Sequence, residues 1–190
     1  MASPAAAPAV GVRAWLDEPR GVGQVLEVVG GVLVPRRVGG NPHHYLARRL
    51  AEEFETQWPG TTATAPGNWA LALDPAGDVL LGRVPDVLVD GDAVLREAVF
   101  TGVPDAVAEV WSPGNTLEEM NDKRRDYRAT GLRVLLEVFL TDTGDVHLEW
   151  LVNAGGRWES AAAAIGEAGL TVVGPRPFSV VPNALLHRPT

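Results

Sequence analysis

Residues 83–90 read Arg-Val-Pro-Asp-Val-Leu-Val-Asp, and residues 107–113 read Val-Ala-Glu-Val-Trp-Ser-Pro. Each segment is a short apolar run typical of a β-strand, and each run contains one acid, Asp86 or Glu109. A carboxylate inside such a run is costly to bury unless another group pairs with it. Two acids on neighbouring strands could share a divalent cation, which would offset that cost. The two segments therefore predict adjacent strands and mark the place in the chain where chemistry is expected.

Helices are predicted on either side of these strands. Residues 41–58 form the clearest helix, because their apolar side chains recur at four-residue spacing along one face. A second helix is expected after Thr116, which can cap it, with Glu119 placed to complete a capping box. A single helical turn is possible at 93–98, inside a loop, and a short helix or turn is expected at 160–168, where alanine is frequent.

The other apolar runs predict strands. Val25–Val29 and Val32–Val34 suggest a hairpin about a Gly-Gly turn. Leu132–Leu140 is almost entirely apolar, which is typical of a central strand buried on both faces. Further strands are expected at 69–73, 79–89, 146–152, 170–173 and 178–181. This order of elements predicts one α/β domain built on a mixed central sheet flanked by helices.

Length and composition indicate an ordinary soluble globular protein. The chain has 190 residues, of which 46% are hydrophobic and 21% charged. Residues 1–19, which begin with an Ala/Pro-rich stretch, are interpreted as a flexible N-terminal tail, and residues 20–190 as a single domain. No apolar run approaches the roughly 18 residues needed to span a bilayer. The absence of cysteine excludes disulfides and thiolate metal sites and fits a cytoplasmic location.

The charge balance restricts the partners that the chain can bind. Sixteen basic and twenty-four acidic side chains give a formal net charge of −8. This balance argues against indiscriminate nucleic-acid binding, because phosphate contacts need clustered Lys and Arg. The charge balance does not exclude a local basic groove.

Lys123, on the predicted helix that follows Glu109, adds a cation to the two acids. Phosphodiester hydrolysis benefits from such a group, which can orient water and stabilise the charge of the transition state. The alternative is a surface pair between Lys123 and Glu119, worth a few tenths of a kcal/mol. In that case Asp86 would be a turn residue and Glu109 would face water. For the two acids, spacing alone favours this alternative at least as strongly as it favours a shared metal site.

The ordered segments resemble the Uma-two family of restriction-endonuclease-like proteins, a branch of the PD-(D/E)XK nuclease superfamily. The matching segments occur in the same order, between about residues 20 and 186. They are residues 26–34, the helix that contains His43, and residues 83–87, 107–113 and 123–131. The resemblance implies a restriction-endonuclease-like core, with a mixed central sheet flanked by helices.

The resemblance also implies roles for individual residues. Asp86 fills the Pro-Asp position and Glu109 the acidic position of the second motif, and both would hold Mg²⁺ or Mn²⁺. Glu27 is a candidate for an additional early acid at the metal. In the superfamily a lysine usually follows two residues after the second acid, but here Trp111 occupies that place. Lys123 is therefore expected to supply the amine from the next helix.

The predicted function is Mg²⁺-dependent hydrolysis of phosphodiester bonds, with DNA as the expected substrate and a homodimer as a possible assembly. One alternative is an inactive nuclease-fold protein that binds a partner or nucleic acid without cutting it. A second is a plain interaction domain whose acids are turn residues on opposite faces of the sheet. His43 and His44 are expected either near the acids or as polar residues at the start of their helix.

Overall fold

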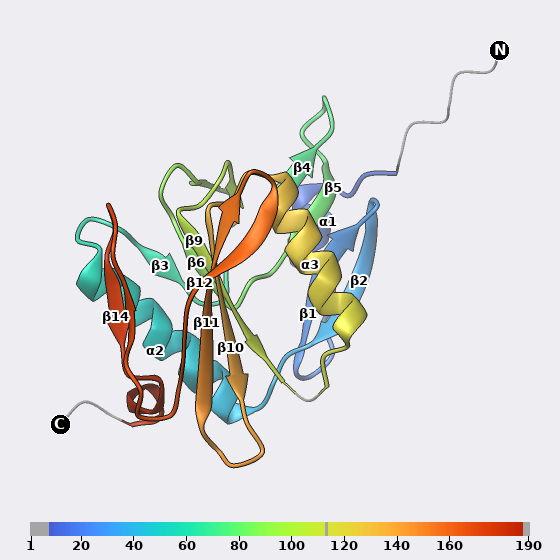
Figure 1. Cartoon of the computed structure of the whole chain (residues 1–190). Coiled ribbons are helices and arrows are strands. Elements are labelled where there is room, and N and C mark those ends of the chain that lie inside the picture. The colour runs from blue at the N-terminus through green and yellow to red at the C-terminus, as the bar shows by residue number, and fades with distance from the viewer. Residues whose placement is uncertain (1–7, 113, 188–190) are drawn as a thin grey trace.

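The structure is a computed structural model that describes residues 8–112 and 114–187, and two six-stranded sheets make up most of it (Figure 1). The strands of the first sheet are β1 (Gln24–Val29), β2 (Val32–Arg37), β4 (Trp69–Leu73), β5 (Val79–Arg83), β7 (Val94–Arg96) and β8 (Val99–Thr101). They lie in the order β2-β1-β5-β4-β8-β7. The predicted α/β class is confirmed, but the single central sheet of the prediction is two sheets in the structure.

The second sheet holds the two acid-bearing segments. Its strands are β3 (Ala63–Thr64), β6 (Val87–Val89), β9 (Ala106–Trp111), β10 (Val134–Leu140), β11 (Val146–Ala154) and β12 (Arg157–Ile165). They lie in the order β12-β11-β10-β9-β6-β3, with β9 and β10 parallel. The run at 132–140 is a central strand, as predicted. A separate hairpin joins β13 (Leu170–Val172) to β14 (Phe178–Val180), and a 3₁₀ helix, η1 (Pro182–Leu186), follows.

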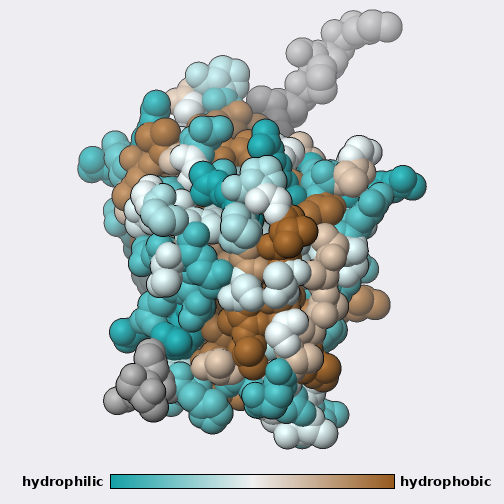
Figure 2. Space-filling model, turned by 60° about the vertical axis from the view of Figure 1, so that its left-hand side comes forward, coloured by the Kyte–Doolittle hydropathy of each residue, from teal (hydrophilic) through white to brown (hydrophobic). Residues whose placement is uncertain are grey.

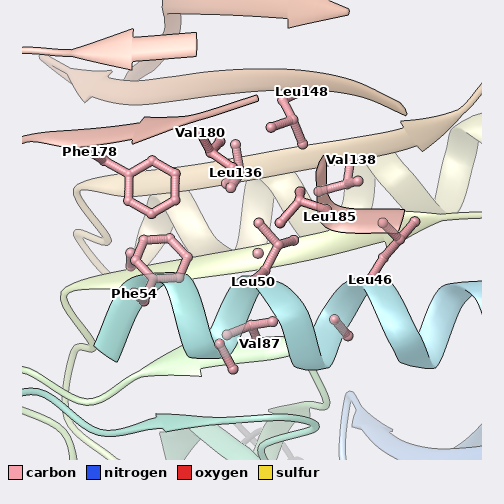
Figure 3. Packing of buried hydrophobic residues seen from close by; sticks show 14 of the residues in the cluster. Leu46, Leu50, Phe54, Val87, Leu136, Val138, Leu148, Phe178, Val180 and Leu185 are labelled. Carbon is pink, nitrogen blue, oxygen red and sulfur yellow. The ribbon is translucent and has the colours of Figure 1, made fainter. Parts of the chain in front are cut away.

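One face of the second sheet is covered by α2 (Asn41–Gln57), whose apolar stripe forms the largest core. Figure 3 shows Leu46, Leu50 and Phe54 of this helix pointing toward the sheet and toward the C-terminal segments. Phe54 stacks on Phe178 with ring centroids 4.8 Å apart. Since side chains alternate along a strand, every second residue of β10, such as Leu136, packs into this core.

The opposite face of the second sheet packs against α3 (Leu117–Ala129). Thr116 caps this helix as predicted, since its side chain accepts a hydrogen bond from the amide of Glu119 at 3.1 Å. The buried residues of the helix are Lys123, Asp126 and Tyr127, which share one face at i, i+3 and i+4 spacing. The helix therefore presents two charged groups and a phenol to the interior.

The chain passes from the first sheet to the second through Val84-Pro85-Asp86, which joins β5 to β6. Pro85 has no amide hydrogen, and its place between two ladders needs none. Its carbonyl accepts a bond from the amide of Gly67 at 3.2 Å. Asp86 therefore stands at the junction of the two sheets, directly before the first residue of β6.

Two segments predicted as helical are strands. The turn expected at 93–98 is part of the β7–β8 hairpin, where Glu97 and Ala98 form a two-residue loop with φ of 47° and 66°. Such primed turns match the twist of the flanking strands. The segment at 160–168 lies mostly in β12, which pairs with β11 over almost its whole length. Pairing with a neighbouring strand overrides the helix preference of alanine there.

The predicted N-terminal tail is wrong where the structure describes it. Residues 12–17 form a short helix, α1 (Val12–Asp17), and Trp15 on this helix is completely buried. Its indole nitrogen donates to the carbonyl of Leu26 at 2.6 Å, and Val10 bridges to Val79. Burial of one large aromatic ring offsets the entropy cost of ordering this segment. Residues 1–7 of the predicted tail lie outside the described residues.

The surface of the protein carries both hydrophobic and hydrophilic residues. Figure 2 shows a band of hydrophobic residues on one face, between hydrophilic residues on either side. Exposed apolar side chains are common on monomers, so the homodimer stays a prediction. Within the described ranges, no helix has the length and apolar character needed to cross a membrane.

Candidate active site

A pocket of about 500 Å³ lies where β1, β2, α2, β9 and α3 meet. The three residues predicted to carry catalysis, Asp86, Glu109 and Lys123, all line it. They come from three places in the chain: the residue directly before β6, the middle of β9 and the second turn of α3. The structure therefore brings these three together on one side of the second sheet.

Asp86 is held by the neighbouring strand. β6 and β9 pair antiparallel with Val87 opposite Ala108, so Asp86 and Glu109 flank this pair on adjacent strands. The amide of Val110 donates to Asp86 Oδ2 at 2.7 Å. The side chain of Asp86 is 14% exposed, and it is partly accessible from the pocket that it lines. The interpretation of Asp86 and Glu109 as acids on opposite faces of the sheet is therefore wrong.

Glu109 is buried and is held by two side chains of α3. Lys123 Nζ lies 3.0 Å from Glu109 Oε1 and 2.9 Å from Oε2, and the Tyr127 hydroxyl donates to Oε1. Glu109 is only 1% exposed, so it does not face water as the alternative required. The alternative of a surface pair between Lys123 and Glu119 is also wrong, because the side chain of Lys123 is buried and contacts Glu109.

Lys123 lies close to Trp111, the residue at the position where the superfamily motif has a lysine. Lys123 is the only lysine of the chain. Its Nζ lies 5.8 Å from the ring centroid of Trp111, which occupies the expected lysine position. The amine therefore reaches the place beside Glu109 from the helix instead of from the strand.

The buried charges shift one another's pKa values. For Lys123, burial alone would lower the pKa, but Glu109, Glu27 and Asp86 outweigh burial and raise it, so the ammonium stays charged. Burial and, more weakly, Asp86 raise the pKa of Glu109 to about 8, although Lys123 and Tyr127 oppose the rise. The negative charge of Glu109 is therefore disfavoured near neutral pH, and a further cation in the pocket would favour it.

Glu27 lies behind this site. It is completely buried, and it is absent from the pocket lining. Its carboxylate contacts Arg83 Nη1 at 2.6 Å, Arg36 Nε at 3.3 Å and Lys123 Nζ at 3.4 Å. These cations occupy the lone pairs that a metal would need, so the contacts favour a role in positioning Lys123.

Arg83 connects Glu27 to α3, and sequence reasoning missed it. Its guanidinium is 1% exposed, and it also binds Asp126 Oδ2 through Nε at 3.0 Å and through Nη2 at 2.5 Å. Arg83 therefore fixes β1, β5 and α3 to one another directly behind the pocket. The sequence did contain a signal for this role, because an arginine at the end of an apolar run is expected to be buried and then requires a charged partner.

His43 is the histidine that reaches the acids. Its Nε2 lies 3.2 Å from Asp86 Oδ2, and its side chain is 8% exposed. His44 lines the same pocket but is exposed at the surface. The hypothesis that a histidine lies near the acids therefore holds for His43.

The carboxylates fit a hard divalent cation. Among the residues that the structure describes, no three His, Cys, Asp or Glu side chains are grouped to hold an ion by themselves. Mg²⁺ usually takes one or two carboxylates and completes its shell with waters and substrate phosphate. Asp86 and Glu109 supply such a pair in a pocket with room for a phosphate group. Carboxylate oxygens are the donors that Mg²⁺ and Mn²⁺ prefer. Both oxygens of Glu109 contact Lys123, so an ion held by Asp86 and Glu109 would displace one of these contacts.

The second sheet is mixed and has a helix on each face, and two acids and a lysine meet at one pocket beside it. The family model Uma2, described as "Putative restriction endonuclease", matches residues 14–178, and the chain belongs to this family. The predicted family is thereby confirmed.

The fold is also similar to a solved structure. This is the crystal structure of a putative nuclease belonging to DUF820 from Anabaena variabilis ATCC 29413. The TM-score is 0.60 at 14% identity, over 87% of this chain and 89% of that chain. At this identity the likeness concerns the fold alone. No match was found among curated proteins.

Proposed function

We propose that this protein is a metal-dependent nuclease that hydrolyses phosphodiester bonds in DNA. The observation that carries the proposal is the convergence of Asp86, Glu109 and Lys123 from three places in the chain on one pocket. Two carboxylates and a charged amine are the groups that phosphodiester hydrolysis needs near the scissile bond. The family membership supports the same reaction class.

The proposed roles follow from the contacts. Asp86 and Glu109 would hold Mg²⁺ or Mn²⁺. When bound, the ion would lower the pKa of a water molecule and offset charge on the phosphate. Lys123 would stabilise charge developing on the phosphoryl oxygens or orient the attacking water, since its ammonium stays charged beside Glu109. His43 would orient Asp86, and Glu27 would hold Lys123 in place.

Metal dependence is the first test of this proposal. Purified protein should cleave a labelled DNA oligonucleotide in millimolar Mg²⁺ or Mn²⁺, and a chelator should stop cleavage because two carboxylates alone leave the phosphate charge unneutralised. Calorimetric titration of both ions should show binding to the wild-type protein. DNA binding without cleavage at any metal concentration would instead support the inactive nuclease-fold alternative.

A second test replaces the single lysine. Lys123→Met should reduce the cleavage rate by about 10²–10³-fold, the typical cost of removing one group that stabilises transition-state charge. Single-turnover rates measure this effect directly. Arg128→Met is the matched control, because Arg128 is exposed on the same helix and outside the pocket lining. An equal loss in both variants would remove Lys123 from the reaction.

A further inference from the structure

The pocket lining carries no net negative charge although the protein is acidic. Four permanently charged cations line it: Arg36, Arg37, Arg48 and Lys123. Three acids line it: Asp86, Glu109 and Glu119. The pocket lining is therefore positive by one charge, within a chain whose formal net charge is −8. A polyanion is therefore repelled less at this pocket than the net charge of the chain alone would suggest.

Two of these arginines are available to a ligand. Arg37, at the end of β2, is exposed and forms no ion pair within the described part of the chain. Arg48, on α2, is 78% exposed, and its pair with Glu52 at 3.0 Å is a surface i,i+4 contact that contributes little. Arg36 is committed to the buried Glu27. The two available arginines, Arg37 and Arg48, thus come from β2 and α2, which are consecutive in the chain and both border the pocket.

The number of free cations limits the nucleic acid that can bind. Proteins that bind duplex DNA tightly contact about 6–10 phosphates. Here two exposed arginines border a pocket of about 500 Å³, a volume in the range of small-ligand sites. At the pocket Glu109 is 1% exposed, so a phosphodiester must enter the pocket to reach it.

We infer that the pocket takes a single DNA strand, with phosphates next to the scissile one held by Arg37 and Arg48. This inference rests on the proposed function, because that function places a phosphodiester between these arginines and the two acids. It goes further by naming the strandedness of the substrate and the residues that bind its backbone. A strand end, a flap or a gap would meet the same requirement as a free single strand.

The inference predicts a shallow salt dependence of binding. For single strands, log K falls by about 0.7 per phosphate contact for each unit of log salt, against about 0.9 for B-DNA. Binding should therefore show a slope near −1.4 from two contacts, and Arg37→Ala or Arg48→Ala should each flatten it by about 0.7. A labelled single-stranded oligonucleotide should bind more tightly than a blunt hairpin duplex of equal length.

Fluorescence anisotropy across a NaCl series measures both quantities. The protein carries Asp86→Asn and the buffer a chelator, so that no cleavage occurs and one repulsive carboxylate is neutral. The control is Arg157→Ala, whose parent side chain is 80% exposed on β12 and outside the pocket lining. It should leave the slope unchanged. Circular dichroism verifies that each variant is folded.

Three results would overturn the inference: tighter binding of the duplex, a slope unaffected by either pocket substitution, or no binding to the single strand at low salt. The proposed function is tested separately. Arginine-dependent binding without cleavage by the wild-type protein in Mg²⁺ would overturn hydrolysis and leave the inference intact. If the wild-type protein cleaves DNA but neither Arg37→Ala nor Arg48→Ala changes the salt dependence of binding, the inference is overturned and the proposed hydrolysis stands.

Discussion

Asp86→Asn is expected to lower the DNA cleavage rate by about 10³-fold or more while leaving the fold intact. A bound metal contributes several kcal/mol of charge stabilisation in the transition state, and each 1.36 kcal/mol corresponds to a factor of ten in rate. Asparagine keeps the size of the side chain and one acceptor oxygen, so the bond from the Val110 amide can persist. The change therefore removes the charge without removing the anchor.

Single-turnover cleavage in saturating Mg²⁺ measures this loss, and calorimetry should show weakened metal binding in the same variant. Asp90→Asn is the matched control, because Asp90 follows the other end of β6 and bonds the Thr62 amide at 3.0 Å, away from the pocket. That variant should keep wild-type activity. Undiminished cleavage by Asp86→Asn would contradict the catalytic role assigned to this carboxylate.

Much of the second sheet and its helices follows from local sequence patterns. The four-residue spacing of Leu46, Leu50 and Phe54 predicts α2, and the structure buries all three. The Thr116 cap predicts the start of α3. These predictions succeed because periodicity and capping are local properties, decided within a few residues.

Other parts of the fold depend on partners distant in sequence. The alanine-rich strand β12 has no strand signature of its own and forms by pairing with β11. Trp15 orders residues whose sequence is typical of a tail, because its indole N–H donates a hydrogen bond to the carbonyl of Leu26. The division into two sheets at Val84–Asp86 is likewise a matter of ladder pairing, which a single sequence does not encode locally.

Some residues of the candidate site were predicted from the sequence and others were not. Asp86, Glu109 and Lys123 were predicted together from the order of their motifs, and the structure gathers them in one pocket. The contact from His43 to Asp86 was one of two options for that histidine. The contact of Tyr127 with Glu109 was not predicted, because it is recognisable only from the packing of α3 against the second sheet.

Arg83→Met should lower the free energy of unfolding by about 3–5 kcal/mol. Removing one partner of a buried ion pair leaves the other charge uncompensated. Here both Glu27 and Asp126 would lose their main cation while remaining buried. Methionine retains much of the apolar stem, so the loss reports on charge more than on packing. Urea unfolding of the wild type and the variant measures the difference.

The charge explanation can be separated from lost packing in two ways. A triple variant that adds Glu27→Gln and Asp126→Asn should recover most of the stability, because no carboxylate of the network is then left uncompensated. Failure to recover would assign the loss to packing.

The pH dependence provides the second separation. Burial, the largest single influence, would raise the pKa of Glu27, but Lys123 and Arg83 together lower it below its ordinary value of 4.5. The wild type therefore holds the stability from this network fully above about pH 4.5 and loses it as pH falls through the lowered pKa. In Arg83→Met the pKa of Glu27 should rise, so the stability gap between the two proteins should narrow as the solution is acidified below pH 4.5. A gap that stays constant with pH would show that the Arg83 charge does not stabilise the support on which Lys123 rests.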